Sequence, residues 1–141
     1  MRKLRFWAVC ATFGALTFAV SCGGGAAVEN LRVAALEQPL AVDSATPDFS
    51  WSMTSEERGA SQASYRIVVA EDQSMKSVVW DSGVVASDES VGILYGSTGT
   101  AQKLAPETDY FWQVEVVDNN ARTLKASSSF STGLMNPTQA A

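Results

Sequence analysis

Acidic side chains are the groups in this sequence that could do catalytic chemistry, because it contains 15 Asp and Glu residues and no histidine. The lack of histidine excludes Ser–His and Cys–His nucleophile pairs and removes the commonest zinc ligand. Glycoside hydrolysis would need two carboxylates held about 5 to 10 Å apart across a cleft. The adjacent acids Glu56–Glu57 and Asp88–Glu89 both fall in polar turns. We therefore interpret them as solvated loop charge and predict no catalytic residue.

A metal or cofactor site has equally little support. The segment 118–120, Asp-Asn-Asn, offers oxygen ligands, but one short turn supplies too few for the six to eight that calcium takes. Asp and Asn tolerate left-handed backbone, so we interpret this segment as a turn. The Gly-, Ser- and Thr-rich stretch 96–102 lacks the spacing of a phosphate-binding loop and is predicted to be an ordinary loop. We predict no bound metal and no cofactor.

Three aromatic residues, Trp80, Tyr95 and Phe111, could stack against a sugar ring and form a glycan-binding platform. Aromatic side chains on β-strands more often belong to the core, where their large apolar area is buried. Glycan binding therefore stays an alternative. Exposure of Trp80 or Phe111 on a sheet face would instead indicate a scaffold that docks a neighbouring domain or chain.

The cysteine at position 22 fits the pattern of a bacterial lipoprotein. The chain begins with three basic residues and an uncharged apolar run of 15 residues over 6–20, shorter than the roughly 20 that span a bilayer as a helix. The segment 19–22, Ala-Val-Ser-Cys, then resembles a lipobox, in which the signal is cut before the cysteine and the thiol accepts lipid. We predict a signal peptide over 1–21, lipidation of Cys22 and a flexible tether over 22–27. A conventional signal with an incidental cysteine is the alternative.

Lipidation would place the protein in the cell envelope as a membrane-anchored lipoprotein. Acyl chains contribute about 0.8 kcal/mol per buried methylene and would hold it to a membrane. The outer membrane is the preferred site, with the periplasmic face and the cell surface both open. Removing the three basic residues of the signal changes the net charge from −5 to −8, which disfavours nucleic acid as a partner. Cys10 lies in the signal, so we expect no disulfide and a fold that depends on its hydrophobic core.

The candidate acids and aromatics described above are expected to be positioned by β-strands. Residues 28–135 consist of short β-rich runs separated by turn residues. The longest run places every second residue from Tyr110 to Val116 on one apolar face. We predict an all-β domain over 28–135, an antiparallel β-sandwich of seven or eight strands, and a disordered tail over 136–141. The expected strands are 29–36, 49–53, 63–70, 78–80, 84–86, 91–95, 109–117 and 125–130.

The segment that leads into the longest strand resembles fibronectin type III domains, a kind of immunoglobulin-like sandwich. In those domains a leucine, a proline, a threonine and a tyrosine precede the sixth strand, and the same residue types occupy 104, 106, 108 and 110. Leu104 would plug the end of the sandwich, and the Tyr110 hydroxyl would bond back to the backbone. Trp51 would be the matching core tryptophan. The predicted structural core residues are Trp51, Tyr65, Leu104, Tyr110 and Trp112.

A narrower resemblance covers residues 28–136. It rests on runs that include Pro47-Asp48-Phe49-Ser50-Trp51, Val79-Trp80-Asp81-Ser82-Gly83 and Tyr110-Phe111-Trp112-Gln113-Val114. These runs resemble the N-terminal immunoglobulin-like domain of bacterial α-L-rhamnosidases. In that family, further β-domains and a helical barrel with the catalytic carboxylates follow this domain.

The resemblance implies a fold and a context but transfers no catalytic residue. The sequence stops shortly after 133–137, near where the family's next domain would begin. We therefore expect a non-catalytic accessory domain of a lipid-anchored α-L-rhamnosidase-like glycoside hydrolase, present without its catalytic barrel as in a gene fragment. Its expected partners are a membrane, through acylated Cys22, and other domains or chains of such an enzyme. A free-standing glycan-binding or adhesion lipoprotein is the alternative function.

Overall fold

The computed structural model describes residues 25–135, and this part of the chain is built from β-strands and their connections. Within that range no helix is long and apolar enough to cross a membrane. The prediction of an all-β sandwich of seven or eight strands is confirmed, with eight strands in the described range. They are β1 (Ala26–Val33), β2 (Asp48–Ser55), β3 (Gln62–Ala70), β4 (Val78–Asp81), β5 (Ile93–Leu94), β6 (Thr100–Ala101), β7 (Asp109–Asp118) and β8 (Thr123–Ser131).

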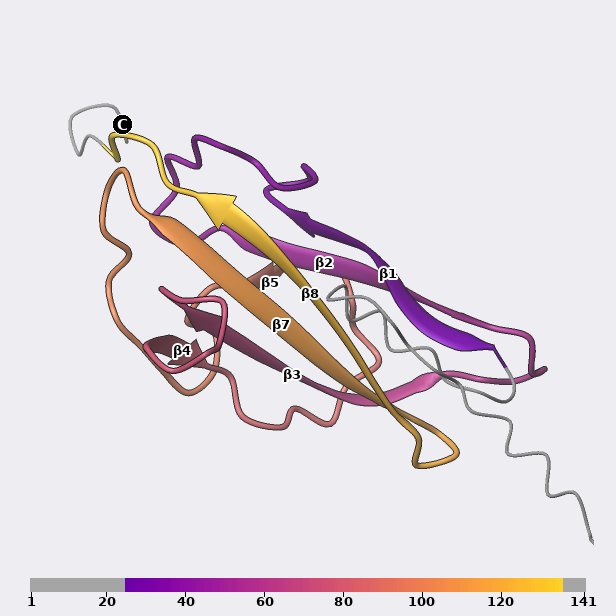
Figure 1. Ribbon diagram of the computed structural model, residues 1–141. Coiled ribbons are helices and arrows are strands. Elements are labelled where there is room, and N and C mark those ends of the chain that lie inside the picture. Colours follow the sequence, from indigo (N-terminus) through magenta and orange to yellow (C-terminus); the bar gives the residue numbers. More distant parts are fainter. Residues whose placement is uncertain (1–24, 136–141) are drawn as a thin grey trace, which may run out of the picture.

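The strands form two antiparallel sheets that pack face to face (Figure 1). The smaller sheet has the strand order β1-β2-β5, and the larger has the order β6-β4-β3-β7-β8. The long strands β3, β7 and β8 pair over most of their length and give the larger sheet its frame. In Figure 1, β1 and β8 both run toward the same end of the sandwich. The residues after β8 therefore leave from the end opposite to the start of β1.

The first strand is shifted from its expected position over 29–36. It begins at Ala26 and pairs through Ala26 and Ala27 with the end of β2. These two alanines were predicted as part of the flexible tether over 22–27, and that boundary is wrong. The strand ends at Val33 because Ala34 and Ala35 take left-handed backbone in a tight turn. Small alanine side chains gave no turn signal in the sequence.

Two further elements differ from expectation. The stretch 96–102, predicted as a loop, contains β6, which pairs with the C-terminal end of β4. Gly99 permits this pairing, because its φ is +69° and a Cβ there would clash with the carbonyl oxygen of Asp81. The expected strand over 84–86 is reduced to one bridge, in which Val85 and Tyr65 exchange backbone hydrogen bonds of 2.8 and 3.0 Å.

The core lies between the two sheets and centres on Phe49 of β2. This ring is fully buried and meets Trp112 of β7 edge-on, with 4.8 Å between ring centroids. It also contacts Trp80 at 5.8 Å and Phe130 at 5.9 Å. One aromatic side chain of the smaller sheet thereby joins three strands of the larger one, each contact adding to the burial of apolar area. The five residues expected in the core, Trp51, Tyr65, Leu104, Tyr110 and Trp112, are all buried.

The hydroxyl of Tyr110 bonds back to the chain as the sequence pattern suggested. It accepts a hydrogen bond of 2.8 Å from the backbone N–H of Ala105, while its ring stacks on Phe130 at 5.4 Å. We expect Tyr110→Phe to lower the free energy of unfolding by about 1 to 2 kcal/mol, because the Ala105 N–H loses its acceptor while the ring packing is retained. Urea unfolding followed by tryptophan fluorescence measures this change. An unchanged midpoint would contradict the role assigned to the hydroxyl.

Candidate functional site

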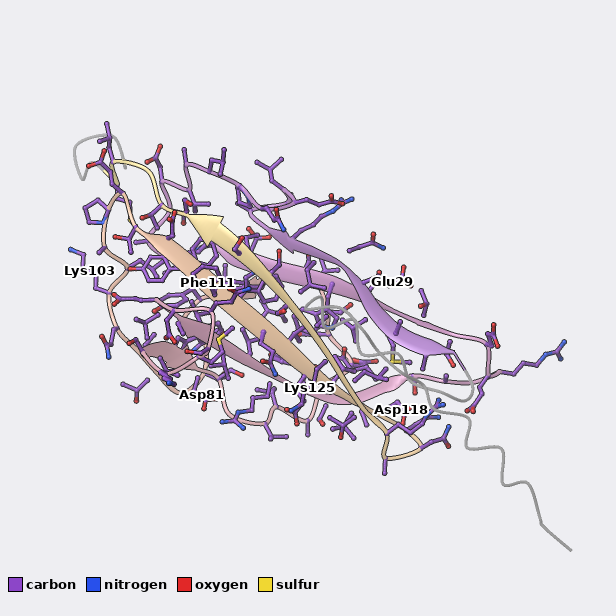
Figure 2. The ribbon with its side chains drawn as sticks, in the orientation of Figure 1. Glu29, Asp81, Lys103, Phe111, Asp118 and Lys125 are labelled. Atoms are coloured by element: carbon purple, nitrogen blue, oxygen red, sulfur yellow. The ribbon has the colours of Figure 1, made fainter. Side chains whose placement is uncertain are left out.

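The outer face of the larger sheet carries a group of charged side chains. The register across β3, β7 and β8 places Arg66 beside Glu115 and Glu115 beside Lys125. Arg66 donates to both carboxylate oxygens of Asp81 on β4, at 3.0 Å from Nε and 2.6 Å from Nη2. The Nζ of Lys125 lies 3.3 Å from a carboxylate oxygen of Glu115. Figure 2 labels Asp81 and Lys125 on this sheet.

The pairing of Arg66 with Asp81 favours the charged form of both groups. The hydrogen bonds to Asp81 raise the pKa of Arg66. The same hydrogen bonds lower the pKa of Asp81, against the opposing effect of its partial burial and with help from the backbone N–H of Gly83. The two side chains are 43% and 38% exposed, so solvent screening limits the pair to at most about 1 kcal/mol.

A shallow, open depression of about 210 Å³ lies on this outer face. Glu115 is the one carboxylate residue on its wall, and it is already paired with Lys125. Hydrolysis of a glycosidic bond needs a second carboxylate across the site. The depression can therefore hold a small polar group but is not equipped for acid–base catalysis. Its lining residues are Arg66, Val68, Met75, Gln113, Glu115 and Lys125.

Trp80, Tyr95 and Phe111, the residues of the alternative glycan platform, do not form one exposed surface. Trp80 and Tyr95 are 1% and 5% exposed and pack edge-on against each other in the core, 5.1 Å apart. The indole N–H of Trp80 donates to the carbonyl of Thr98 at 2.7 Å. Burial raises the pKa of Tyr95 to about 12, with a smaller effect from Tyr110. Phe111 remains half-buried on the outer face of β7 (Figure 2), and one such ring does not make a stacking platform.

The adjacent acids that the sequence offered as a carboxylate pair lie on the surface. Glu56, Glu57, Asp88 and Glu89 are all exposed. Glu57 is tied to the turn after β7, where its carboxylate lies 3.3 Å from the guanidinium of Arg122. Within residues 25–135 no group of three potential metal-ligating side chains comes together. The arrangement of these acids is that of surface charge, in line with the loop interpretation.

The turn over 118–120 is built around a buried carboxylate. The side chain of Asp118 is fully buried and accepts hydrogen bonds from the backbone N–H groups of Asn120 and Arg122, at 2.9 and 2.8 Å. The Nε of Arg122 donates to its second oxygen at 2.8 Å. Asn119 also joins this turn to the loop before β3, through the carbonyl of Gly59. The oxygens of Asp118 therefore hold the turn in shape.

Gln62, at the start of β3, is a buried polar residue that sequence reasoning missed. Its side-chain oxygen accepts a hydrogen bond of 2.9 Å from the indole N–H of Trp51. Its amide nitrogen donates to the carbonyls of Ser87 and Glu89, at 2.9 and 2.7 Å. These bonds fasten the connection between β4 and β5 to both sheets. A single glutamine after a polar loop carries no sequence signal of such a role, because its partners lie on another strand and in a distant connection.

The residues that follow β8 are fixed by hydrogen bonds to two loops. Thr132 donates its hydroxyl to the carbonyl of Ala105 at 2.6 Å and accepts from the N–H of Thr108 at 3.0 Å. Asp43 accepts from the N–H of Met135 at 3.1 Å. A Cβ at Gly133 would meet the Asp43 carboxylate, so the glycine lets that side chain lie close to the backbone. The chain therefore leaves the sandwich in a defined direction.

Cys22, the predicted signal peptide over 1–21 and the predicted disordered tail over 136–141 lie outside the described residues. Lipidation of Cys22 and the attachment to a membrane stay predictions.

Comparison with known proteins identifies the family to which this sandwich domain belongs. The family of Rha78A-like N-terminal immunoglobulin domains matches residues 28–136. The chain belongs to this family. The α-L-rhamnosidase of Streptomyces avermitilis is 40% identical over 108 residues, which are 74% of this chain and 10% of that protein. The resemblance to this family that the sequence motifs indicated is confirmed.

Solved structures of α-L-rhamnosidases contain a similar domain. The crystal structure of the Streptomyces avermitilis enzyme complexed with L-rhamnose superposes with a TM-score of 0.72 at 36% identity, covering 82% of this chain and 11% of that one. The α-L-rhamnosidase from Dictyoglumus thermophilum gives a TM-score of 0.71 at 30% identity, covering 79% and 13%. The chain thus spans about a tenth of the length of the relatives that it matches.

Proposed function

We propose that this domain is a non-catalytic N-terminal accessory module of a lipid-anchored α-L-rhamnosidase-like glycoside hydrolase. The observation that carries the proposal is the 40% identity to a segment that makes up only 10% of an α-L-rhamnosidase. The geometry supports a non-catalytic role, because Glu115, the one carboxylate on the wall of the depression, is paired with Lys125. A module of this kind supports other domains of the enzyme and leaves hydrolysis to them.

The absence of hydrolysis is directly testable. Purified residues 22–141 are expected to release no aryl group from an aryl α-L-rhamnoside above the buffer rate, since the depression on the outer face has one carboxylate, Glu115, where hydrolysis needs two. The α-L-rhamnosidase of Streptomyces avermitilis serves as the positive control under the same conditions. Clear turnover by the purified module would show that the proposal is wrong.

The membrane anchor is the second part of the proposal. Cys22 precedes the first strand residue, Ala26, by four positions, a distance of at most about 14 Å of extended chain. An acyl group on Cys22 would therefore hold the start of β1 close to the lipid surface. The opposite end of the sandwich would then face away from the membrane.

We expect Cys22→Ser to move the protein from the membrane fraction to the soluble fraction of the bacterial envelope. The serine hydroxyl does not replace the thiol as lipid acceptor, so the acyl chains and their membrane affinity are lost. Fractionation with immunoblotting, together with the intact mass of the purified protein, measures both effects. Cys10→Ser is the matched control and should leave the distribution unchanged. If the wild type and Cys22→Ser differ in intact mass only by the exchange of sulfur for oxygen, the lipid anchor is excluded.

A further inference from the structure

The depression on the outer face of the larger sheet contains a polar side chain that the fold does not use. Gln113 of β7 lies between Val68 of β3 and Ser127 of β8 in the register of the sheet. Its side chain lines the depression, and its carboxamide makes no hydrogen bond to any other group within residues 25–135. The amide oxygen and the amide nitrogen are therefore both open to a ligand.

An apolar wall lies beside this amide. Val68 is the direct neighbour of Gln113 on β3, and Met75 reaches the same depression from the turn between β3 and β4. Met75 has left-handed backbone with a φ of +57°. The carboxylate of Asp72 holds the turn by accepting hydrogen bonds of 2.9 and 2.6 Å from the backbone N–H groups of residues 76–77. These bonds fix the part of the turn that carries Met75.

The charged groups around the depression compensate one another. Arg66 donates two hydrogen bonds to Asp81, and the Nζ of Lys125 lies 3.3 Å from a carboxylate oxygen of Glu115. An anion would have to compete with a carboxylate for one of these cations, so the depression favours an uncharged ligand. An ammonium has three N–H donors and a carboxylate has two acceptor oxygens. The pair of Lys125 and Glu115 therefore offers donors and acceptors side by side.

We propose that this depression binds one neutral sugar unit of a glycan. A hydroxyl both donates and accepts hydrogen bonds, so neighbouring sugar hydroxyls match the Gln113 carboxamide and the pair of Glu115 and Lys125. The C–H face of the sugar ring would lie against Val68 and Met75, which supply the apolar contact common in small-molecule sites. The volume of about 210 Å³ is smaller than the roughly 300 Å³ at which pockets for drug-sized ligands begin, so it suits a single ring.

This site is distinct from the aromatic platform considered from the sequence, because none of Trp80, Tyr95 and Phe111 lines it. The inference goes beyond the proposed function and does not depend on it. Binding of a sugar by these residues needs no catalytic domain and no membrane anchor.

Titration of the chain 22–141 with methyl α-L-rhamnoside and with methyl α-D-glucoside, followed by ¹⁵N–¹H NMR, tests the proposal. We expect saturable shifts of the Gln113 side-chain amide and of the backbone amides over 66–68 and 113–115. The expected Kd is roughly 5 mM, because a shallow, open site buries little of the ligand.

Two variants and a matched control show whether the depression is the site. Gln113→Ala should weaken binding about fivefold, because it removes a donor and an acceptor. Met75→Ala should weaken it about threefold through the loss of apolar contact, and it changes a turn rather than a strand. The control Gln102→Ala removes an exposed glutamine from the connection between β6 and β7 and should leave the Kd unchanged.

The titrations measure binding by the module and not hydrolysis, so their failure would leave the accessory role standing. The proposal is overturned if neither glycoside gives a saturable shift up to about 50 mM, roughly ten times the expected Kd. Shifts confined to another face, or equal binding by the two variants and the wild type, would also overturn it. Sodium D-glucuronate covers the remaining ligand class. Tighter binding of this anion than of either neutral glycoside would assign the depression to anionic ligands and contradict the proposal.

Discussion

Replacing Phe49 with alanine is expected to lower the free energy of unfolding by about 4 kcal/mol. The ring is fully buried and contacts Trp80, Trp112 and Phe130 across the two sheets. Its removal loses the transfer free energy of the aromatic ring and leaves a cavity that the rigid strands around it cannot close. A domain of this size has a total stability of about 5 to 15 kcal/mol, so the variant would be close to unfolded at elevated temperature.

Phe111→Ala is the matched control for this prediction, because it removes the same side chain from a half-buried position on the outer face of β7. We expect it to cost about 1 kcal/mol, in proportion to the smaller apolar area lost. Urea unfolding of both variants at pH 7, followed by circular dichroism, gives the two values. Equal losses for the two variants would show that Phe49 is not the centre of the core.

The second large expected loss in the free energy of unfolding comes from removing the buried carboxylate of Asp118. Asp118→Ala is expected to cost about 3 kcal/mol, because two backbone N–H groups and the guanidinium of Arg122 lose a common acceptor. Asp88→Ala, at an exposed carboxylate in the connection between β4 and β5, is the control and should cost less than about 0.5 kcal/mol. If both substitutions had the same small effect, the turn would not depend on Asp118.

The same carboxylate makes stability depend on pH. Burial alone would raise the pKa of Asp118, but the hydrogen bonds from Arg122 and Asn120 outweigh it and lower the pKa overall. A carboxyl whose pKa is lower in the folded state stabilises the fold above its unfolded pKa of about 4, and this contribution is lost as the pH falls through the folded value. Urea unfolding of the wild type and of Asp118→Asn between pH 7 and pH 2 measures this. The difference in free energy of unfolding between the wild type and the variant should become smaller as the pH falls. A difference that stays constant over this range would contradict the prediction.

The sequence was sufficient for the longest strand, for the all-β sandwich and for the family. Alternation over Tyr110 to Val116 predicted a strand with one buried face, and those residues are fully buried at every second position. The spacing of Leu104, Pro106, Thr108 and Tyr110 predicted the bond from the tyrosine hydroxyl to the backbone, which is present. Both features are local, since a two-residue period and a short corner depend only on neighbours along the chain.

Only the tertiary structure decided which aromatic rings are covered. Trp80, Tyr95 and Phe111 all lie on or beside strands, yet the first two are buried and Phe111 is on the outer face. A two-residue period shows which residues share a face, but the pairing of β3, β4 and β7 determines which face meets the second sheet. Gln62 follows the same reasoning, because its partners lie on β2 and in the connection between β4 and β5. The local sequence was enough to assign the adjacent acids to exposed turns, whereas only the tertiary structure showed that Asp81 pairs with Arg66, because that contact joins two strands.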